Sequence, residues 1–165
     1  MIVIADTSPL NYLALIGEID LLQKLFSQVI IPEGVLAELQ HPQAPPAVKN
    51  WIAALPAWVE VKAAPVSHDP ELARLGRGER EAIALAEMLH ADLVLIDEKK
   101  GFAEAGKRAL RVAGTLFVLE AAAERDLIEL PIALDKLRQT SFRIAEIFLT
   151  QALHRDAARK ATLGK

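Results

Sequence analysis

Two kinds of hydrophobic pattern alternate along the chain. Short apolar runs rich in β-branched residues cover positions 1–5, 29–31, 93–96 and 111–113, and they predict buried strands. At positions 59–62, Val59 and Val61 alternate with charged residues, which predicts a strand at an exposed edge. Between the runs, apolar residues recur every three or four positions, as expected for amphipathic helices.

The helical segments are predicted from this spacing and from the residues that start and stop helices. Ser8 is expected to cap the first helix, with Pro9 in its first turn, and Gly17 ends it. The predicted helices cover residues 10–16, 19–26, 32–41, 48–55, 79–90, 100–110, 116–125, 132–139 and 142–159. Strands that alternate with helices predict an α/β fold, specifically a three-layer α/β/α sandwich with a mainly parallel sheet.

Composition supports one folded domain over residues 1–165, with extra C-terminal helices at 131–160. The chain of 165 residues is 52% hydrophobic and 25% charged, which is typical of a globular protein. It has no cysteine, so disulfides and thiolate metal sites are excluded. No apolar run is long enough for a membrane helix, and the N-terminus lacks the basic start of a signal peptide. A cytoplasmic location is therefore expected.

The distribution of charge is compatible with a nucleic-acid partner but does not by itself indicate one. The formal net charge of −3 provides no overall attraction to nucleic acid. Basic residues nevertheless gather in two groups: Lys99, Lys100, Lys107, Arg108 and Arg111, and then Arg155, Arg159, Lys160 and Lys165. Solvated helix faces are the simpler interpretation of each group, although basic patches beside an acidic site would suit a phosphodiester substrate.

Acidic residues occur where this fold would bring them together. Two predicted strands end in an aspartate, Asp6 and Asp97, and ligands bind at the carboxyl ends of parallel strands. Glu38, Glu79 and Glu81 lie on two of the predicted helices. Each acid alone could serve as a helix cap, a dipole partner or a surface residue. Together they predict oxygen ligands for Mg²⁺ or Mn²⁺.

Zinc is not indicated by the histidines. The four histidines show no ligand spacing and are expected at the surface: His41, His68, His90 and His154.

Five segments resemble the PIN domains, and within them the VapC-like ribonuclease toxins and their less characterised relatives. They read VIADTSPL, IPEGVLAEL, GEREAIALA, LVLIDEKKG and VAGTLFVL, and they cover about the first 120 residues. The resemblance implies a parallel-sheet α/β/α fold and metal-dependent hydrolysis of RNA. It also implies a toxin–antitoxin pair, in which a small antitoxin protein would be the partner.

Carried onto this chain, the family's acids fall on Asp6, Glu38 and Asp97, with Glu98 as an alternative to the last. A threonine or serine near the metal would match Thr7 or Ser8, although a capping role is favoured for Ser8.

The third acid stays open between Glu79 and Glu81. PIN domains usually have an aspartate at the start of this helix, whereas this chain has glutamates. The interval of 18 residues to Asp97 favours Glu79, and the local string EAIALA favours Glu81. The two side chains lie about 200° apart around a helix, so only one of them is expected to face the site.

Three other functions remain as alternatives. A receiver-like phosphoacceptor domain is disfavoured because a lone Asp6 follows the first strand and Lys99 is poorly placed for its lysine. A non-catalytic PIN-like scaffold that binds RNA or protein stays open, because glutamate replaces the expected aspartate. Cleavage of DNA is the third alternative. The apolar helices at 10–16 and 21–26 could form a homodimer face, although a place in the core is favoured.

Overall fold

The computed structural model describes residues 1–164. Their backbone forms two compact units, Met1–Thr115 and a second that begins at Leu116. Within residues 1–164, no helix is both long and apolar enough to cross a bilayer.

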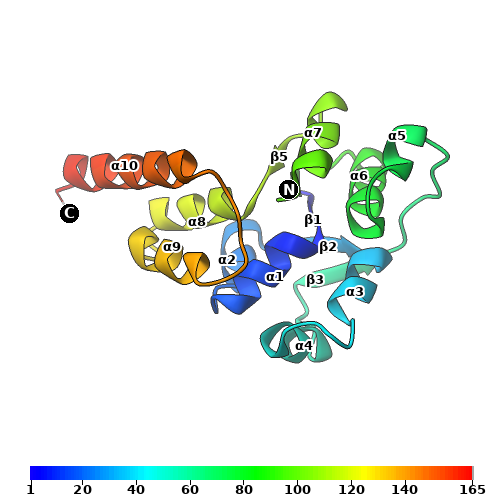
Figure 1. The fold of residues 1–165 in the computed structure, drawn as a ribbon, viewed down its shortest axis with the longest axis horizontal. Helices are drawn as coiled ribbons and strands as arrows, with labels where there is room; N and C mark the ends of the chain where they lie inside the picture. The colour runs from blue at the N-terminus through cyan, green and yellow to red at the C-terminus, as the bar shows by residue number, and fades with distance from the viewer. Residues whose placement is uncertain (165) are drawn as a thin grey trace. The chain divides into compact units, whose positions relative to one another are not determined.

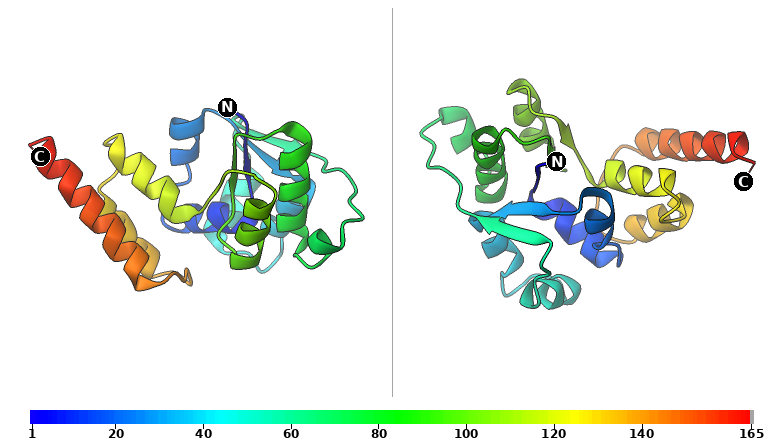
Figure 2. Two further views of the ribbon diagram at one scale, coloured as in Figure 1. Left: turned by 90° about the horizontal axis from the view of Figure 1, so that it is seen from above. Right: turned by 180° about the vertical axis from the view of Figure 1, so that it is seen from behind.

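A five-stranded parallel sheet forms the centre of the first unit. Its strands are β1 (Val3–Ala5), β2 (Val29–Pro32), β3 (Val59–Lys62), β4 (Leu93–Leu95) and β5 (Val112–Ala113). Their order is β3-β2-β1-β4-β5, and every pairing is parallel. Figure 2 shows β2 and β3 side by side at one edge. The predicted parallel sheet and its exposed edge strand are therefore confirmed.

Helices cover both faces of this sheet. They are α1 (Thr7–Leu15), α2 (Leu21–Phe26), α3 (Glu33–Leu39), α4 (Pro46–Ala53), α5 (Pro70–Ala73), α6 (Arg77–Leu89) and α7 (Lys99–Lys107). In Figure 1, α1, α3 and α4 lie on one side of the sheet, and α6 and α7 lie on the other. This division follows from right-handed crossovers, since the chain reverses direction across the sheet after β3. The predicted three-layer sandwich is confirmed.

The central position of β1 places the first acidic residue. Ile4 pairs with Ile30 of β2 on one side and with Val94 of β4 on the other. The register continues past the end of the strand, where the Asp6 N–H donates to the Leu95 carbonyl at 2.9 Å. The carboxyl ends of β1 and β4 therefore lie together, and the residues that follow them face the same edge of the sheet.

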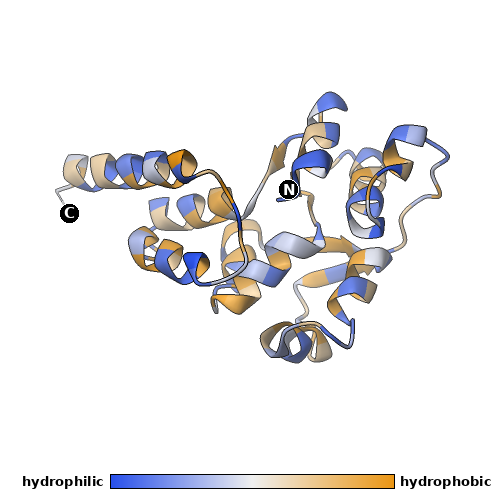
Figure 3. Ribbon diagram, in the orientation of Figure 1, coloured by the Kyte–Doolittle hydropathy of each residue, from blue (hydrophilic) through white to orange (hydrophobic). Residues whose placement is uncertain are grey.

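Apolar burial explains why these elements form. All three residues of β1 and of β4 are buried, and Figure 3 colours β2 mostly hydrophobic. The largest fully buried side chains come from strands and helices alike: Ile4, Leu10, Leu13, Leu21, Leu22, Ile31, Leu39, Leu72, Ile83, Leu85, Leu95 and Ile96. Leu10 and Leu13 of α1 and Leu21 and Leu22 of α2 thus belong to the core.

The second unit consists of helices. They are α8, which begins at the last residue of the first unit (Thr115–Glu124), α9 (Leu130–Arg138) and α10 (Glu146–Thr162). Within this unit α9 packs on α10, and the ion pairs Arg138–Glu146 at 2.7 Å and Lys160–Glu129 at 2.8 Å join the two helices. The extra C-terminal helices are therefore present.

Most predicted helix ends differ from the observed ones by one to three residues. Three other features of the helices also differ from the prediction. Ser8 does not cap the first helix, because α1 already begins at Thr7, directly after Asp6. The last helix begins at Glu146 rather than 142, because the Thr140 side chain accepts a hydrogen bond from the Phe142 N–H at 3.1 Å and holds a turn there. The short helix α5 was not predicted, although Asp69 caps it and a proline follows.

Candidate acidic site

Asp6 is a buried carboxyl at the end of β1. It is only 2% exposed and stands at the point where the extended strand turns into α1. Burial raises its pKa, and the charges of Glu79, Glu38 and Asp97 raise it further, while a hydrogen bond from the Thr7 N–H lowers it. The result is a pKa of about 7, against an ordinary value of 3.8. Asp6 therefore lies in an environment that favours either a proton or a cation.

Glu38 reaches Asp6 from α3. Its Oε2 accepts a hydrogen bond from the Thr7 hydroxyl at 2.8 Å, and its Oε1 accepts one from the Gly78 N–H at 3.3 Å. A Cβ atom at Gly78 would lie 2.8 Å from Asp6 Oδ1 and 2.9 Å from Glu38 Oε1. Two carboxylates thus meet at the backbone of α6, at a position where only glycine leaves room for both.

Glu79 lies at the start of α6, close enough to Glu38 and Asp6 for their charges to interact. Its Oε2 accepts a hydrogen bond from the Gly76 N–H at 3.0 Å, which closes the first turn of the helix. Burial raises the pKa of Glu79, and the charges of Glu98 and Glu38 add to that increase against the Gly76 hydrogen bond. Glu79 is therefore part of the same electrostatic cluster as Asp6.

Glu81 faces a different part of the molecule. One of its oxygens accepts a hydrogen bond from the Gly34 N–H at 3.0 Å, at the start of α3. The other forms an ion pair with the Arg77 Nε at 2.6 Å. Both oxygens of Glu81 are thus engaged away from Asp6. Of the two glutamates left open by the sequence, the structure brings Glu79 to the other acids.

Asp97 follows β4 and binds Thr115. Its Oδ1 accepts from the Thr115 N–H at 2.7 Å, and its Oδ2 accepts from the Thr115 hydroxyl at 2.6 Å. Burial raises the pKa of Asp97, although the two Thr115 hydrogen bonds oppose this change. Asp97 therefore binds the first residue of α8, and its negative charge also raises the pKa of Asp6. Asp6, Glu38, Glu79 and Asp97 are called the acidic cluster below.

Three functional positions were missed or assigned differently by sequence reasoning. Glu98, the alternative to Asp97, caps α7 by accepting from the N–H groups of Lys100 and Gly101 at 2.8 and 3.0 Å. Thr115 and Gly78 were not singled out at all. The glycine–threonine pair after the last strand was a usable signal for Thr115, because a polar residue there can cap the following helix.

Several residues of the two basic groups form ion pairs with acidic side chains and are therefore not available to bind a substrate. Arg108 forms ion pairs with Asp69 at 2.7 Å, Glu87 at 2.9 Å and Glu104 at 3.0 Å, so it joins three segments of the first unit. These contacts make Arg108 a structural residue. The exposed members of this group are Lys99, Lys100, Lys107 and Arg111.

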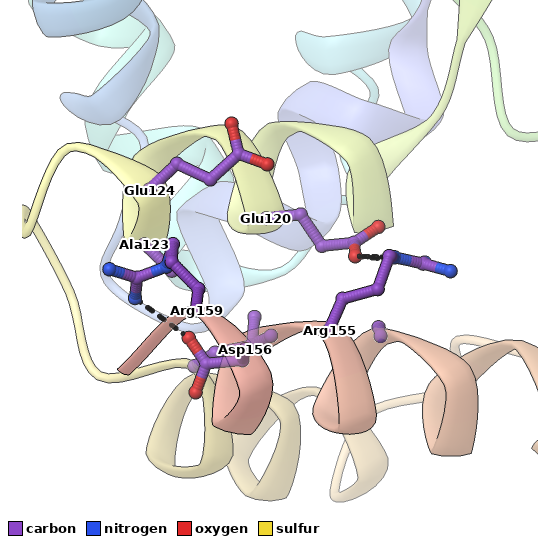
Figure 4. Close-up of a pocket in the computed structure, with 8 residues that line it drawn as sticks. Glu120, Ala123, Glu124, Arg155, Asp156 and Arg159 are labelled. Carbon is purple, nitrogen blue, oxygen red and sulfur yellow. Dashed lines mark hydrogen bonds and ion pairs between the residues drawn. The ribbon is translucent and has the colours of Figure 1, made fainter. Parts of the chain in front are cut away.

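Arg155 and Arg159 of the C-terminal basic group line a pocket of about 240 Å³ within the second unit. Figure 4 shows Arg155 paired with Glu120 and Arg159 paired with Asp156, at 2.8 and 2.9 Å. Arg159 lies within a charged network, in which the buried Asp156 also binds Lys160 at 3.1 Å. Lys165 falls outside the described residues. All four histidines are exposed, as expected.

The acidic cluster has the donor chemistry of a hard-cation site, with carboxylate oxygens and no soft ligands. Within residues 1–164, however, no three acids or histidines converge as a complete set of metal ligands. The reason is visible in the contacts: Glu79 is turned to the Gly76 N–H and Asp97 to Thr115. The part of the cluster that converges on one point consists of Asp6 and Glu38.

A PIN-domain family model matches residues 2–157. The chain belongs to the PIN-domain family. The resemblance to PIN domains inferred from the sequence segments is thereby confirmed, and the match runs through both compact units. Searches of curated proteins and of solved structures gave no significant match. PIN domains are generally nucleases, so this chain has a nuclease-type fold.

Proposed function

We propose that this PIN domain is a metal-dependent endoribonuclease that uses Mg²⁺ or Mn²⁺. The observation that carries the proposal is the meeting of Asp6 and Glu38 at the Gly78 backbone, with Glu79 and Asp97 close enough to raise the pKa of Asp6. Clustered carboxylates at the carboxyl edge of a parallel sheet are costly for folding, unless a cation offsets their repulsion. The family supports a nuclease, and RNA is the substrate that we assign.

Carboxylate oxygens are suitable ligands for a hard cation. Of the four acids, Asp6 and Glu38 are the two whose carboxylates meet at one point, beside Gly78. Asp6 and Glu38 would hold the metal, while Glu79 and Asp97 would add negative charge and bind through water. A bound Mg²⁺ or Mn²⁺ supplies an activated water and offsets charge on the leaving oxygen.

The chain's own groups prepare this site. The Thr7 hydroxyl and the Gly78 N–H hold the Glu38 carboxylate in a fixed orientation. Thr115 does the same for Asp97 through two hydrogen bonds. Asp6 has a pKa of about 7, so without metal it is protonated in part of the molecules at neutral pH. Because a metal must displace that proton, its affinity rises with pH.

The decisive experiment compares the wild-type protein with Asp6→Asn on a panel of single-stranded and structured RNAs, in Mg²⁺, in Mn²⁺ and in EDTA. We expect cleavage by the wild type that needs metal and is lost in the variant. Asp92→Asn is the matched control, since Asp92 is an exposed aspartate at the opposite end of β4. Equal metal-dependent cleavage by wild type and Asp6→Asn would refute the proposal. A parallel DNA panel tests the alternative substrate.

A non-catalytic scaffold is the second candidate, and the observation in its favour is the lack of a converged set of three ligands within residues 1–164. Metal titration separates the two candidates. A nuclease site is stabilised by Mn²⁺, because a ligand that binds only the folded state raises the midpoint of unfolding. A scaffold without a metal site shows no such shift.

The toxin role and a small antitoxin partner rest on family resemblance alone, and we propose them on that basis. Expression of the wild-type chain, but not of Asp6→Asn, is expected to stop growth of the host cell. Growth unaffected by an active ribonuclease would count against a toxin and favour a nuclease with another role.

A further inference from the structure

The first turn of α7 lies beside the acidic cluster. α7 begins at Lys99, shortly after β4 ends at Leu95, so this turn stands at the carboxyl edge of the sheet (Figure 1). A Cβ atom at Gly101 would lie 3.3 Å from Glu79 Cγ, which means that the backbone of α7 packs directly on that side chain. Any group exposed on this turn is therefore close to the proposed site of cleavage.

Phe102 is the exposed aromatic residue of this turn. The residue is 42% exposed, although it directly follows the buried Gly101. Consecutive helical residues are about 100° apart, so the ring stands at the border between the packed face of α7 and solvent. An aromatic ring at this border presents a flat apolar surface beside a set of carboxylates.

Lys99 lies on the same face, three positions before Phe102. It is exposed, and within residues 1–164 it forms no ion pair with an acidic residue. A cation in the first turn of a helix opposes the helix dipole, so Lys99 costs local stability. Lys107 at the far end of α7 has the favourable position instead. A contribution to helix stability therefore accounts for a lysine at position 107 but not for a lysine at position 99.

The exposed positions of α7 that follow Phe102 carry small side chains or none. Ala103 and Gly106 follow Phe102 by one and four positions and are both exposed. A Cβ atom at Gly106 would meet nothing within 4 Å, so packing does not require glycine there. Glycine destabilises a helix relative to alanine, so neither packing nor helix stability accounts for glycine at this position.

We propose that Phe102 stacks on a base of single-stranded RNA whose scissile phosphate faces the acidic cluster, and that Lys99 pairs with a neighbouring phosphate. This inference rests on the proposed ribonuclease function and names positioning residues for it. Exposed aromatic rings beside cations bind single strands, because every base has a face to stack and every linkage a charge. The helix N–H groups are not available to the phosphate, since Glu98 already accepts from those of Lys100 and Gly101.

Binding of a fluorescently labelled, short, mixed-sequence single-stranded RNA to the full chain in EDTA tests the proposal without cleavage. Phe102→Ala should weaken binding by roughly 5–150-fold, the range for loss of one base–aromatic stack. Phe102→Trp should retain binding. Lys99→Ala should make RNA affinity less dependent on salt, reducing the slope of log affinity against log salt concentration by about 1, as expected for the loss of one phosphate contact. Matched controls are Met88→Ala, an exposed apolar residue near the far end of α6, and Lys107→Ala.

A ribose-phosphate chain without bases distinguishes stacking from a structural effect. If Phe102 stacks on a base, Phe102→Ala weakens binding of the RNA and leaves binding of the baseless chain unchanged. An equal loss on both, no loss on either, or a loss as large in Phe102→Trp as in Phe102→Ala would overturn the proposal. So would a change of oligomeric state in Phe102→Ala by sedimentation, since the ring would then be covered by a second copy.

Failure of this inference can be told apart from failure of the proposed function. RNA binding that depends on Phe102, in a protein without metal-dependent cleavage, supports the stacking role and refutes the nuclease. Cleavage that Asp6→Asn abolishes, with binding and KM unaltered in Phe102→Ala, supports the nuclease and refutes the stacking role.

Discussion

Thr115 holds Asp97 through two hydrogen bonds at once, from its backbone N–H at 2.7 Å and from its hydroxyl at 2.6 Å. Thr115 is fully buried, and it connects the end of the fourth strand to the start of α8. An acid of the candidate site is thus oriented by a residue 18 positions further along the chain.

Replacement of Thr115 by valine should lower the free energy of unfolding by about 2 kcal/mol. The shape is kept, but a partly buried carboxylate loses one charge-assisted hydrogen bond. Urea denaturation measures the change, and Thr115→Ser, which keeps the hydroxyl, should recover most of the lost stability. Equal stability of Thr115→Val and the wild type would show that this hydrogen bond contributes nothing to folding.

The stability of the metal-free protein should fall as pH rises from about 4 to about 7. Asp6 has a pKa of about 7 in the folded state against an ordinary value of 3.8, so in this interval the native state binds a proton that the unfolded state has lost. Stability contributed by that proton is full below the unfolded pKa and is lost as pH passes the folded pKa. The shift corresponds to about 4 kcal/mol.

Thermal unfolding in EDTA across this pH range measures the effect. Asp6→Asn should flatten much of the slope and should be more stable than the wild type at pH 8. The raised pKa values of Glu79 and Asp97 act in the same direction, so a smaller slope remains in the variant. With Mn²⁺ present, stabilisation by the metal should be larger at pH 8 than at pH 5. A wild-type stability that rises between pH 4 and 7 in EDTA would contradict the environment described for Asp6.

Glu79→Gln and Glu81→Gln should differ in activity. Glu79 belongs to the acidic cluster, so its neutralisation should weaken metal binding and lower cleavage by about 10–100-fold. Glu81 pairs with Arg77 and accepts from Gly34, so Glu81→Gln should retain activity within about two-fold and lose only a little stability. Mn²⁺ titration and initial cleavage rates of both variants decide between them. The reverse order of effects would assign the third acid to Glu81.

Gly78→Ala should abolish activity, although alanine is normally the better helix residue. Its Cβ would lie 2.8 Å from Asp6 Oδ1 and 2.9 Å from Glu38 Oε1, so both carboxylates would have to move. Gly106→Ala, in another helix, is the control for folding stability alone, because its Cβ meets nothing within 4 Å. This control should gain about 0.5–1 kcal/mol of stability. Full activity of Gly78→Ala would show that the close approach is not needed for the site.

Much of the fold could be predicted from the chain because it depends on local patterns. The apolar runs before Asp6 and Asp97 predict buried strands, and the alternation at Val59 and Val61 predicts the edge strand. Parallel strands bring their carboxyl ends to one edge, so the neighbourhood of Asp6 and Asp97 also followed from the order of elements. These inferences needed only hydrophobic periodicity and chain connectivity.

Contacts between distant segments decided the rest. The sequence leaves Glu79 and Glu81 equivalent, since both are acids at the start of one helix; the packing of α3 turns Glu81 to Gly34 and leaves Glu79 near Asp6. The role of Gly78 was also hidden in the sequence, because it depends on the carboxylates of Asp6 and Glu38 that a Cβ atom there would strike. Local periodicity determines which elements form, whereas the direction and environment of a side chain depend on neighbours that only the folded chain brings within reach.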